Sequence, residues 1–407
     1  MKNICVLPFM HTLILPNGDI NLCCNSTVTD TLPSVTKTVG NILNNVHHVE
    51  VRKQMLAGTQ PTSCEKCWNA ERLGIKSYRQ QQNFTYMAYF PRTLFADKNG
   101  ELNSGVKFFD VRFNNTCNLK CIMCSSDYSS SWVEDEKKLI PILQDSLLKN
   151  HFIHRSEQYD KEVFKWSKDA DIVNAIIANA SSLERLHFAG GEPLLSKQHT
   201  VLIKELIKLK LAPKLFLSYN TNGEFIDGEL LSLWSHFKRV KIFYSLDGIG
   251  DHNDYIRFPS RWKDHETRLD YINSETPKNV DWRLLTTVSA LNIAYMPELA
   301  DWKLTKNYKN IHNNFLDGNL FHASLLETPN YLNSTVLPLT VKQDIKQKLL
   351  RFSNSRSYNP IANDCINFMF DRDDSDLLPN MKEYLNGIDT IRGTDFKKTF
   401  PILQNLS

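Results

Sequence analysis

Apolar runs and amphipathic stretches alternate along the middle of the chain. Six apolar runs are predicted to be strands, at residues 106–113, 183–189, 214–219, 239–245, 280–288 and 319–325. The segments between them carry apolar residues at three- and four-residue spacing, which predicts helices. Such alternation indicates an α/β fold with parallel strands joined by right-handed crossovers. Six units fit a partial (β/α)6 barrel better than a closed eight-fold barrel, with active residues at the C-terminal ends of the strands.

The pattern changes on both sides of this barrel. Residues 1–75 are rich in cysteine and are predicted to form a small domain, followed by a linker at 76–105. The barrel is predicted to span 106–325, and its stretch at 125–182 is longer than a plain βα unit needs. This insertion either decorates the cleft or adds scaffold. The alternation then ends, and 326–407 is predicted to be a helical C-terminal extension.

Composition places the chain among ordinary globular proteins. Of its 407 residues, 42% are hydrophobic and 23% are charged. A net charge of +3 gives no strong nucleic-acid signal, and no apolar run approaches the length of a membrane span. Nine cysteines, with no charged leader before a long apolar segment, predict a cytoplasmic protein whose thiolates are available to metals.

The strongest chemical signal is a cysteine triplet directly after the first predicted strand. Cys117, Cys121 and Cys124 have the spacing CX3CX2C. Three thiolates this close can hold three irons of a cubane [4Fe–4S] cluster and leave the fourth iron open to a small molecule. A closed zinc site needs four ligands, and the next cysteine is Cys365. The triplet therefore predicts a cluster with an open iron.

Polar turns follow the second and third predicted strands. The second strand leads into Gly190-Gly191-Glu192, where two glycines let the backbone turn tightly and present bare N–H and C=O groups. By itself this segment can be any strand-to-helix turn. The third strand ends with Asn220 and Asn222, which either face a ligand or serve a β-turn.

The fourth and fifth predicted strands also end in candidate site residues. Ser245 and Asp247 alternate onto one face, the expected barrel interior, and Arg257 follows them. A guanidinium can bind a carboxylate as a fork. The alternative is an N-cap at Asp247 and a surface arginine. The fifth strand ends at Val288.

Together, the triplet, the Gly-Gly-Glu-Pro turn and the Ser-Leu-Asp-Gly…Arg pattern resemble the radical S-adenosylmethionine (radical SAM) superfamily. The resemblance implies that the cluster binds S-adenosylmethionine (SAM) at its open iron and passes it one electron. SAM then splits into methionine and a 5′-deoxyadenosyl radical, which takes a hydrogen atom from the substrate. The protein orients and shields that radical.

The same resemblance assigns the SAM contacts. Glu192 on its Gly190-Gly191 turn is expected to meet the methionine amino group, because a carboxylate binds an ammonium strongly. Ser245 and Arg257 are expected at the methionine carboxylate, and Asp247 near the ribose. Further implied contacts belong to Met123, Asn220, Asn222 and Val288. Met123 stands where the family usually has an aromatic residue near adenine, and a methionine can also pack against a purine.

A second cysteine pattern precedes the barrel. Cys5, a Pro-Asn-Gly-Asp turn and Cys23 form CX12GX4C, and Cys64 and Cys67 form CX2C. This block resembles the twitch domain, a shorter relative of the SPASM domain. The resemblance implies that these four cysteines fully ligate an auxiliary [4Fe–4S] cluster, with Cys24 as a possible substitute for Cys23. The family usually places this domain after the barrel, whereas here it comes first.

The rival interpretation of the four N-terminal cysteines is a zinc ribbon. The protein would then be a zinc-binding structural or nucleic-acid-associated protein without radical chemistry. The preferred interpretation is a radical SAM oxidoreductase whose auxiliary cluster accepts an electron from the substrate. It predicts a small-molecule or peptide substrate and a low-potential electron donor such as flavodoxin or ferredoxin. Candidate substrate contacts, each with a packed or surface role as the alternative, are His187, Tyr219, Arg283 and His322.

Overall fold

The structure is a computed structural model that describes most of the chain. The described residues are 3–27, 32–35, 39–72, 74, 76–89, 91, 96–97, 99–169, 172–313, 320–356 and 359–404. Among these residues, no helix combines the length and apolar character that crossing a membrane requires.

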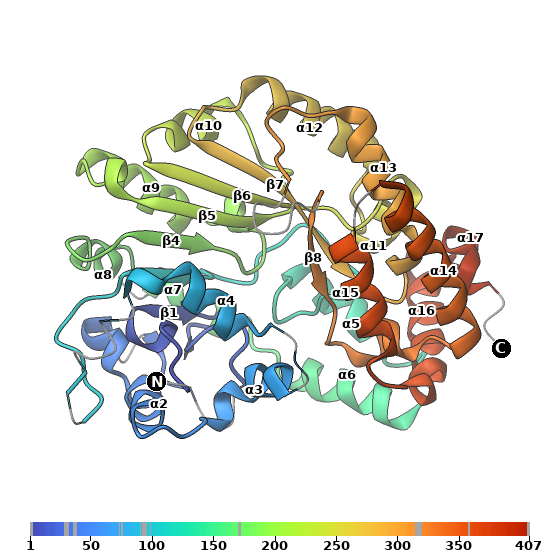
Figure 1. The fold of residues 1–407 in the computed structure, drawn as a ribbon, viewed down its shortest axis with the longest axis horizontal. Coiled ribbons are helices and arrows are strands. Elements are labelled where there is room, and N and C mark those ends of the chain that lie inside the picture. The colour runs from blue at the N-terminus through green and yellow to red at the C-terminus, as the bar shows by residue number, and fades with distance from the viewer. Residues whose placement is uncertain are drawn as a thin grey trace. The chain divides into compact units, whose positions relative to one another are not determined.

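Eight strands form one mostly parallel sheet (Figure 1). The strands are β1 (His11–Ile14), β2 (Ile20–Asn21), β3 (Phe108–Val111), β4 (Arg185–Phe188), β5 (Phe216–Thr221), β6 (Arg239–Ser245), β7 (Val280–Val288) and β8 (His322–Leu325). Their order is β2-β1-β3-β4-β5-β6-β7-β8. The hairpin pair β1–β2 is antiparallel, whereas β1–β3, β3–β4, β4–β5 and β7–β8 are parallel. The α/β fold predicted from the sequence pattern is therefore confirmed.

The six predicted strands are all present. β6 and β7 have the predicted bounds, and β3 and β4 lie inside their predicted ranges. β5 begins and ends later than predicted, and β8 lies inside 319–325, whose first residue is outside the described part of the chain. The strands β1 and β2 come from the cysteine-rich block, and β1 continues the sheet by pairing with β3.

The chain divides into two compact units. The first unit contains Met1–Asn115, Asp160–Tyr219 and His236–Val240. The second unit contains Thr116–Tyr159, Asn220–Ser235 and Lys241–Ser407. The long 125–182 stretch is thus shared between the two units, and each unit is described below by itself.

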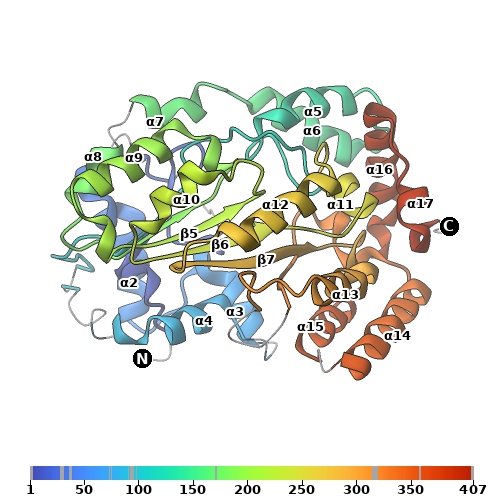
Figure 2. The same cartoon turned by 90° about the horizontal axis from the view of Figure 1, so that it is seen from above.

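The first unit contains strands β1 to β4 and most of β5 together with helices. Its helices are α2 (Val46–Leu56), α3 (Glu65–Arg72), α4 (Tyr78–Thr85), α7 (Trp166–Asp169), α8 (Ile172–Ala178) and α9 (Lys197–Lys208). Neighbouring helices α8 and α9 lie side by side (Figure 2). Leu186, Phe188, Leu217 and Tyr219 alternate along β4 and β5 onto the buried face. The opposite face carries His187 and Ser218, which are paired across the two strands.

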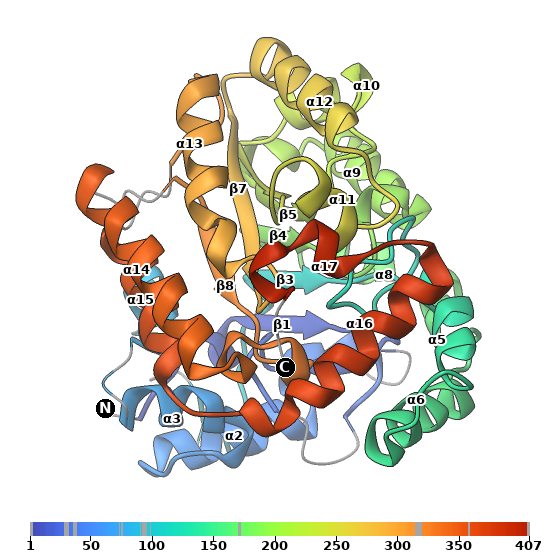
Figure 3. The same cartoon turned by 90° about the vertical axis from the view of Figure 1, so that its right-hand side faces the viewer.

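The second unit holds most of the helices. They are α5 (Val133–Leu139), α6 (Ser146–Gln158), α10 (Gly228–Ser235), α11 (Asp251–Ile256), α12 (Trp262–Glu275), α13 (Met296–Lys306), α14 (Leu339–Arg356), α15 (Asn359–Phe370), α16 (Leu378–Arg392) and α17 (Phe396–Thr399). Helix α16 packs against α5 (Figure 3). Its apolar residues recur at three- and four-residue spacing and form a buried face, and it ends at Gly393 with φ +67°.

Candidate active site

The cysteine triplet lies on a loop of the second unit that runs beside residues 256–258. The backbone N–H of Lys120 donates to Phe258 O at 2.7 Å, and that of Ile122 donates to Ile256 O at 2.7 Å. A turn then brings the N–H of Cys124 to Cys121 O at 2.8 Å. These bonds fix the backbone from which the three thiols project.

Side chains also bind the carbonyl groups of this loop. Ser131 Oγ donates to Cys117 O at 2.6 Å, and Ser129 Oγ donates to Leu119 O at 2.6 Å. Trp132 Nε1 donates to Cys121 O at 3.1 Å, and Tyr384 OH of α16 donates to Ile122 O at 2.8 Å. Since buried carbonyls need partners, these four contacts stabilise one loop conformation. None of the four side chains was singled out in the sequence.

The three thiols act on one another electrostatically. Burial raises the pKa of Cys124, and the neighbouring Cys121 and Cys117 raise it further, whereas Arg257 opposes the rise. Burial also raises the pKa of Cys121, which Arg257 and Arg392 counter. Within the described residues, no three or more His, Cys, Asp or Glu side chains are arranged around a single metal ion. In a cubane cluster each thiolate binds its own iron, so this donor set of three grouped thiols fits an open [4Fe–4S] cluster.

Asp247 and Arg257 form a buried ion pair beside the loop. Arg257 Nη1 donates to Asp247 Oδ2 at 2.7 Å, and the backbone N–H of Thr287 donates to Asp247 Oδ1 at 2.7 Å. Asn292 Nδ2 donates to Asp247 O at 2.9 Å, and Asp247 is only 1% exposed. Burial works to lower the pKa of Arg257, but Cys121 and Asp247 raise it above its usual range. The buried Nε of Arg257 meets no hydrogen-bond partner in the described ranges.

The other predicted contacts of the second unit lie at strand ends or on the loop. Asn222 Nδ2 donates to Asn118 Oδ1 at 2.9 Å, which links the end of β5 to the triplet loop. Asn220, Ser245 and Met123 are half-buried, and Val288 is buried at the end of β7. The structure therefore connects Asn222 directly to the loop, while the SAM contacts of all four residues stay predictions.

The Gly190-Gly191-Glu192 turn belongs to the first unit. Gly190 has φ +117°, and a Cβ there would lie 2.9 Å from Arg112 Cβ, so glycine is needed for conformation and for space. Glu192 is 2% exposed, and its Oε1 accepts a hydrogen bond from Leu194 N at 3.1 Å. The carboxylate is thus held at the start of the short 3-10 helix Pro193–Leu195. Its contact with the amino group of SAM stays a prediction.

The four N-terminal cysteines are grouped in the first unit. Burial raises the pKa of Cys5, and the nearby Cys64 and Cys67 raise it further. Burial raises the pKa of Cys64 to about 12, again with a contribution from Cys67. The pKa of Cys23 is raised by burial, by Cys24 and by Cys5. All nine cysteines of the chain are described, and none forms a disulfide.

The hairpin between Cys5 and Cys23 turns at Gly18. Gly18 has φ +85°, and a Cβ there would lie 2.8 Å from Trp166 Cγ. Strands β1 and β2 flank this turn. Cys5 acts electrostatically on Cys23 and is acted on by Cys64 and Cys67, so the four thiols form a donor set that fits a fully ligated cluster, in which each thiolate binds its own iron.

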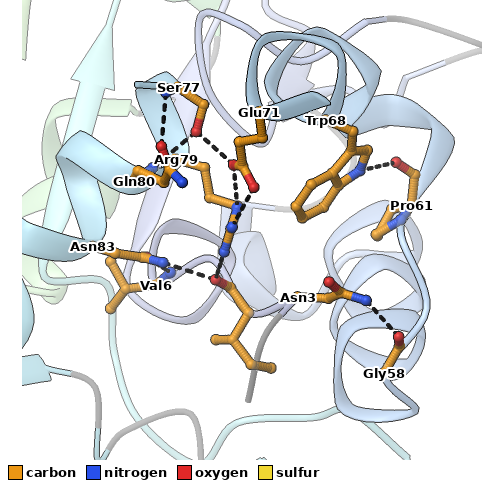
Figure 4. A network of polar contacts seen from close by, with 11 residues as sticks. Asn3, Val6, Gly58, Pro61, Trp68, Glu71, Ser77, Arg79, Gln80 and Asn83 are labelled. Carbon is orange, nitrogen blue, oxygen red and sulfur yellow. Dashed lines mark hydrogen bonds and ion pairs between the residues drawn. The ribbon is translucent and has the colours of Figure 1, made fainter. Parts of the chain in front are cut away.

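Arg79 joins the segments that carry these cysteines (Figure 4). Its guanidinium binds Glu71 of α3 through Nε at 2.9 Å and Nη2 at 2.7 Å, and Nη1 donates to Ile4 O at 2.6 Å. It also stacks 4.7 Å from the ring centre of Trp68. Ile4 precedes Cys5 and Trp68 follows Cys67, so one arginine fixes both segments. The sequence held no signal for this role.

A polar row crosses β3, β4 and β5 on the face of the first unit that carries His187. Asp110, His187 and Ser218 are register partners, and His187 Nδ1 lies 2.9 Å from Ser218 Oγ. Asp110 is buried, and its Oδ1 accepts no hydrogen bond from the described residues. Burial lowers the pKa of His187, and Asp110 opposes that effect. Asp110 also raises the pKa of Cys24, after burial, so the row lies near that cysteine.

The remaining candidates for substrate contact have other surroundings. Tyr219 is fully buried, and its OH lies 2.9 Å from His199 Nε2. Arg283 pairs with Asp281 at 3.2 Å. His322 is exposed, with its ring 5.8 Å from that of Phe243. Of the four candidates, His187 lies in the polar row described above.

Comparison with known proteins assigns the middle of the chain. Residues 111–302 match the Radical SAM superfamily. The match lies in the middle of the chain and covers less than half of its length. It includes the triplet and every predicted SAM contact, whereas Cys5, Cys23, Cys64 and Cys67 lie outside the matched residues.

Several solved structures resemble the chain at low sequence identity. Native anSMEcpe with bound AdoMet is 16% identical, covers 61% of this chain and 59% of its own, and gives a TM-score of 0.36. SuiB of Streptococcus suis bound to S-adenosylmethionine is 13% identical, with coverages of 77% and 64% and a TM-score of 0.36. TYW1 with a lysine-pyruvate adduct is 14% identical, with coverages of 63% and 72% and a TM-score of 0.28. The chain thus spans about three fifths of the first two structures, and no curated protein matches it.

Proposed function

We propose that this protein is a radical SAM enzyme that oxidises a small molecule or peptide. The observation that carries the proposal is the triplet of grouped thiols on a tied loop within the residues that match the Radical SAM superfamily. When bound, the open-iron cluster supplies a site for SAM and the electron that cleaves it to methionine and a 5′-deoxyadenosyl radical. The electron donor is proposed to be a low-potential protein such as flavodoxin or ferredoxin in a reducing cytoplasm.

Two side chains of opposite charge are proposed to bind the two charged groups of the methionine moiety of SAM. Glu192 binds the ammonium group as a carboxylate. Arg257 binds the SAM carboxylate together with Ser245, and its Nε is available because only Nη1 is bonded to Asp247. Asp247 is proposed to bind the ribose. The remaining proposed contacts to SAM are Met123, Gly190, Gly191, Asn220, Asn222 and Val288.

We further propose that Cys5, Cys23, Cys64 and Cys67 hold an auxiliary [4Fe–4S] cluster. The grouping of their thiols and the Arg79 contacts support this assignment. The cluster's proposed role is to accept an electron from the substrate radical. The row of Asp110, His187 and Ser218 is proposed to contact the substrate, because it is polar and lies near Cys24.

Production of 5′-deoxyadenosine tests the proposal. We expect anaerobically reconstituted protein to form it slowly from SAM and dithionite, even without substrate. Replacing Cys117, Cys121 and Cys124 with Ala is expected to abolish it, because the cluster then has no protein ligands. Cys365→Ala is the matched control, since it removes a buried thiol from α15. Continued SAM cleavage by the triple variant would show that the loop is not the cluster site.

A further inference from the structure

The C-terminal helix α16 makes contacts with the triplet loop that its sequence did not predict. Tyr384 OH donates to Ile122 O, although the two residues are 262 positions apart. Farther along α16, Arg392 Nε donates to Asp135 Oδ2 of α5 at 3.1 Å. The same Asp135 accepts a 2.8 Å hydrogen bond from Lys120 Nζ through Oδ1. Helices α5 and α16, which lie outside a plain βα barrel, therefore both contact the loop.

Arg392 is a buried cation at this loop. Its side chain is 2% exposed, and its guanidinium lies 4.6 Å from the ring centre of Trp132 and 5.0 Å from that of Phe258. Trp132 Nε1 binds Cys121 O, and Phe258 O binds the N–H of Lys120. The guanidinium thus lies against the Trp132 ring, whose Nε1 is hydrogen-bonded to the loop, and against the ring of Phe258, whose backbone carbonyl is hydrogen-bonded to the loop.

The charge of Arg392 is incompletely balanced. Both Nη1 and Nη2 are buried and meet no hydrogen-bond partner among the residues that the structure describes. Asp135 is the carboxylate bonded to Arg392, and it also pairs with Lys120, so the three side chains together carry one positive charge. A buried, partly unpaired guanidinium is unfavourable unless it faces negative charge.

We infer that Arg392 is an electrostatic partner of the cluster held by the triplet, and that its buried charge raises the reduction potential of that cluster. This inference rests on the proposed function. Reduction adds one electron from the donor and no proton, so the cluster and its three thiolates become more negative by one charge. A nearby cation stabilises the reduced form more than the oxidised form, because the interaction scales with the product of the charges. Potentials of iron–sulfur clusters depend on such surrounding charge.

The midpoint potential of the cluster tests the inference. The wild-type protein, Arg392→Met and Arg392→Lys are reconstituted with iron and sulfide and titrated under EPR detection. The signal to follow is the one that changes when SAM is added, because it marks the cluster with an open iron. We expect Arg392→Met to lower the midpoint potential and Arg392→Lys to stay close to wild type. Arg372→Met is the matched control, since Arg372 is an exposed arginine that pairs with Asp374 at 2.6 Å.

A variant expected to change the potential in the opposite direction separates the effect of the Arg392 charge from its packing against the loop. Asp135→Asn removes the carboxylate and leaves Lys120 and Arg392, so it is expected to raise the potential. Wild-type potentials in Arg392→Met and Asp135→Asn, each with normal iron content, would overturn the inference. Iron loss in Arg392→Met together with an unchanged potential in Asp135→Asn would also overturn it and leave Arg392 as a loop anchor. A wild-type protein with no SAM-sensitive signal would instead contradict the proposed function.

Discussion

Charged side chains beside the loop of the cysteine triplet form ion pairs, and one of these pairs joins Asp247 with Arg257. Arg257 contributes one hydrogen bond to a carboxylate that is 1% exposed, and Thr287 contributes a backbone N–H to its other oxygen. Removing the arginine leaves a buried negative charge with one partner. Such half-pairs are strongly unfavourable, even where the complete pair adds little to stability.

Arg257→Met is therefore expected to lower the free energy of unfolding by about 3 kcal/mol. Urea denaturation of the iron-free protein measures the change. Arg257→Met combined with Asp247→Asn should recover part of the loss, because the remaining group is then neutral. Equal stability of the single and double variants would show that the carboxylate does not depend on the arginine.

Glu192→Gln is expected to weaken SAM binding without changing iron content. The amide can still accept the Leu194 N–H, so the turn is kept, but the charged contact with the SAM ammonium is lost. The loss should be about 2 kcal/mol, or roughly thirtyfold in affinity. Equilibrium binding of SAM measures it, with Glu205→Gln on α9 as the control because Glu205 pairs with Lys208 at the helix surface. Unchanged affinity would remove Glu192 from the site.

At the scale of single residues, sequence motifs identified candidate site residues but not the contacts that these residues make. Asp247 and Arg257 were found because they stand close together in a familiar pattern. Asp135, Arg392 and Arg79 were missed because their partners are distant in sequence, and no local spacing signals a tertiary contact. The pairing of Arg257 with Asp247 was also missed, since the motif assigned both groups to SAM.

Two glycines of the second unit, each just after a strand or a helix, have a left-handed backbone conformation. Gly223, directly after β5, has φ +76°, and a Cβ there would lie 2.0 Å from Tyr244 Cε2. Gly393, at the end of α16, has φ +67° and open space around the missing Cβ. The two glycines share a backbone conformation but differ in their surroundings.

Gly223→Ala is thus expected to destabilise the protein by about 3 kcal/mol, because overpacking adds to backbone strain. Gly393→Ala should lose only about 1 kcal/mol, the penalty for a left-handed alanine. Both residues lie in the second unit, so the same chemical-denaturation transition reports on them. Similar losses in both variants would mean that Tyr244 moves aside.

Helix α9 carries a buried histidine that links stability to pH. Burial lowers the pKa of His199 to about 3, and its Nε2 lies 2.9 Å from Tyr219 OH. Between pH 6.5 and 3 the unfolded chain binds a proton that the folded chain does not. Stability is therefore full above pH 6.5 and falls as the pH is lowered, by about 1.4 kcal/mol per pH unit.

Urea denaturation of the whole protein at pH 7, 6 and 5 checks this slope. His199→Gln should reduce the slope of the free energy of unfolding against pH by the contribution of one titrating group, because glutamine does not titrate. An unchanged slope in that variant would assign the acid sensitivity to other residues, such as His11, whose pKa burial lowers to about 4.

Element prediction succeeded where apolar runs were long. β6 and β7 are seven and nine residues long, with apolar residues alternating along part of each, and both were predicted with their observed bounds. β1 was missed because it has only four residues, two of them the polar His11 and Thr12, although all four are buried. Its place beside β3 is set by tertiary pairing that the local pattern does not encode.

The whole molecule is proposed to carry two clusters, one in each compact unit. Cys64→Ala with Cys67→Ala is expected to reduce iron from about eight to about four per chain, because each cubane holds four irons. SAM cleavage should persist, since the open iron belongs to the triplet. Iron and sulfide analysis, together with the 5′-deoxyadenosine assay, measures both effects.

Two outcomes would contradict parts of this assignment. A folded double variant that keeps all its iron would show that these cysteines are not cluster ligands, and zinc in the wild-type protein would support the zinc alternative. Half the iron with normal product formation would make the second cluster structural. The oxidative reaction proposed for the substrate would then need another electron acceptor.

The hydrogen bond from Tyr384 to Ile122 also bears on how the protein is made. Its two residues are 262 positions apart, and a ribosome adding 5–20 residues per second takes roughly 13–50 seconds to cover that interval. During this time the nascent triplet lacks the contacts of Tyr384 and Arg392. The backbone that presents its thiols is then held by fewer contacts. Delivery of iron and sulfide to this loop is therefore expected to follow the emergence of α16 from the ribosome, as a late step in maturation.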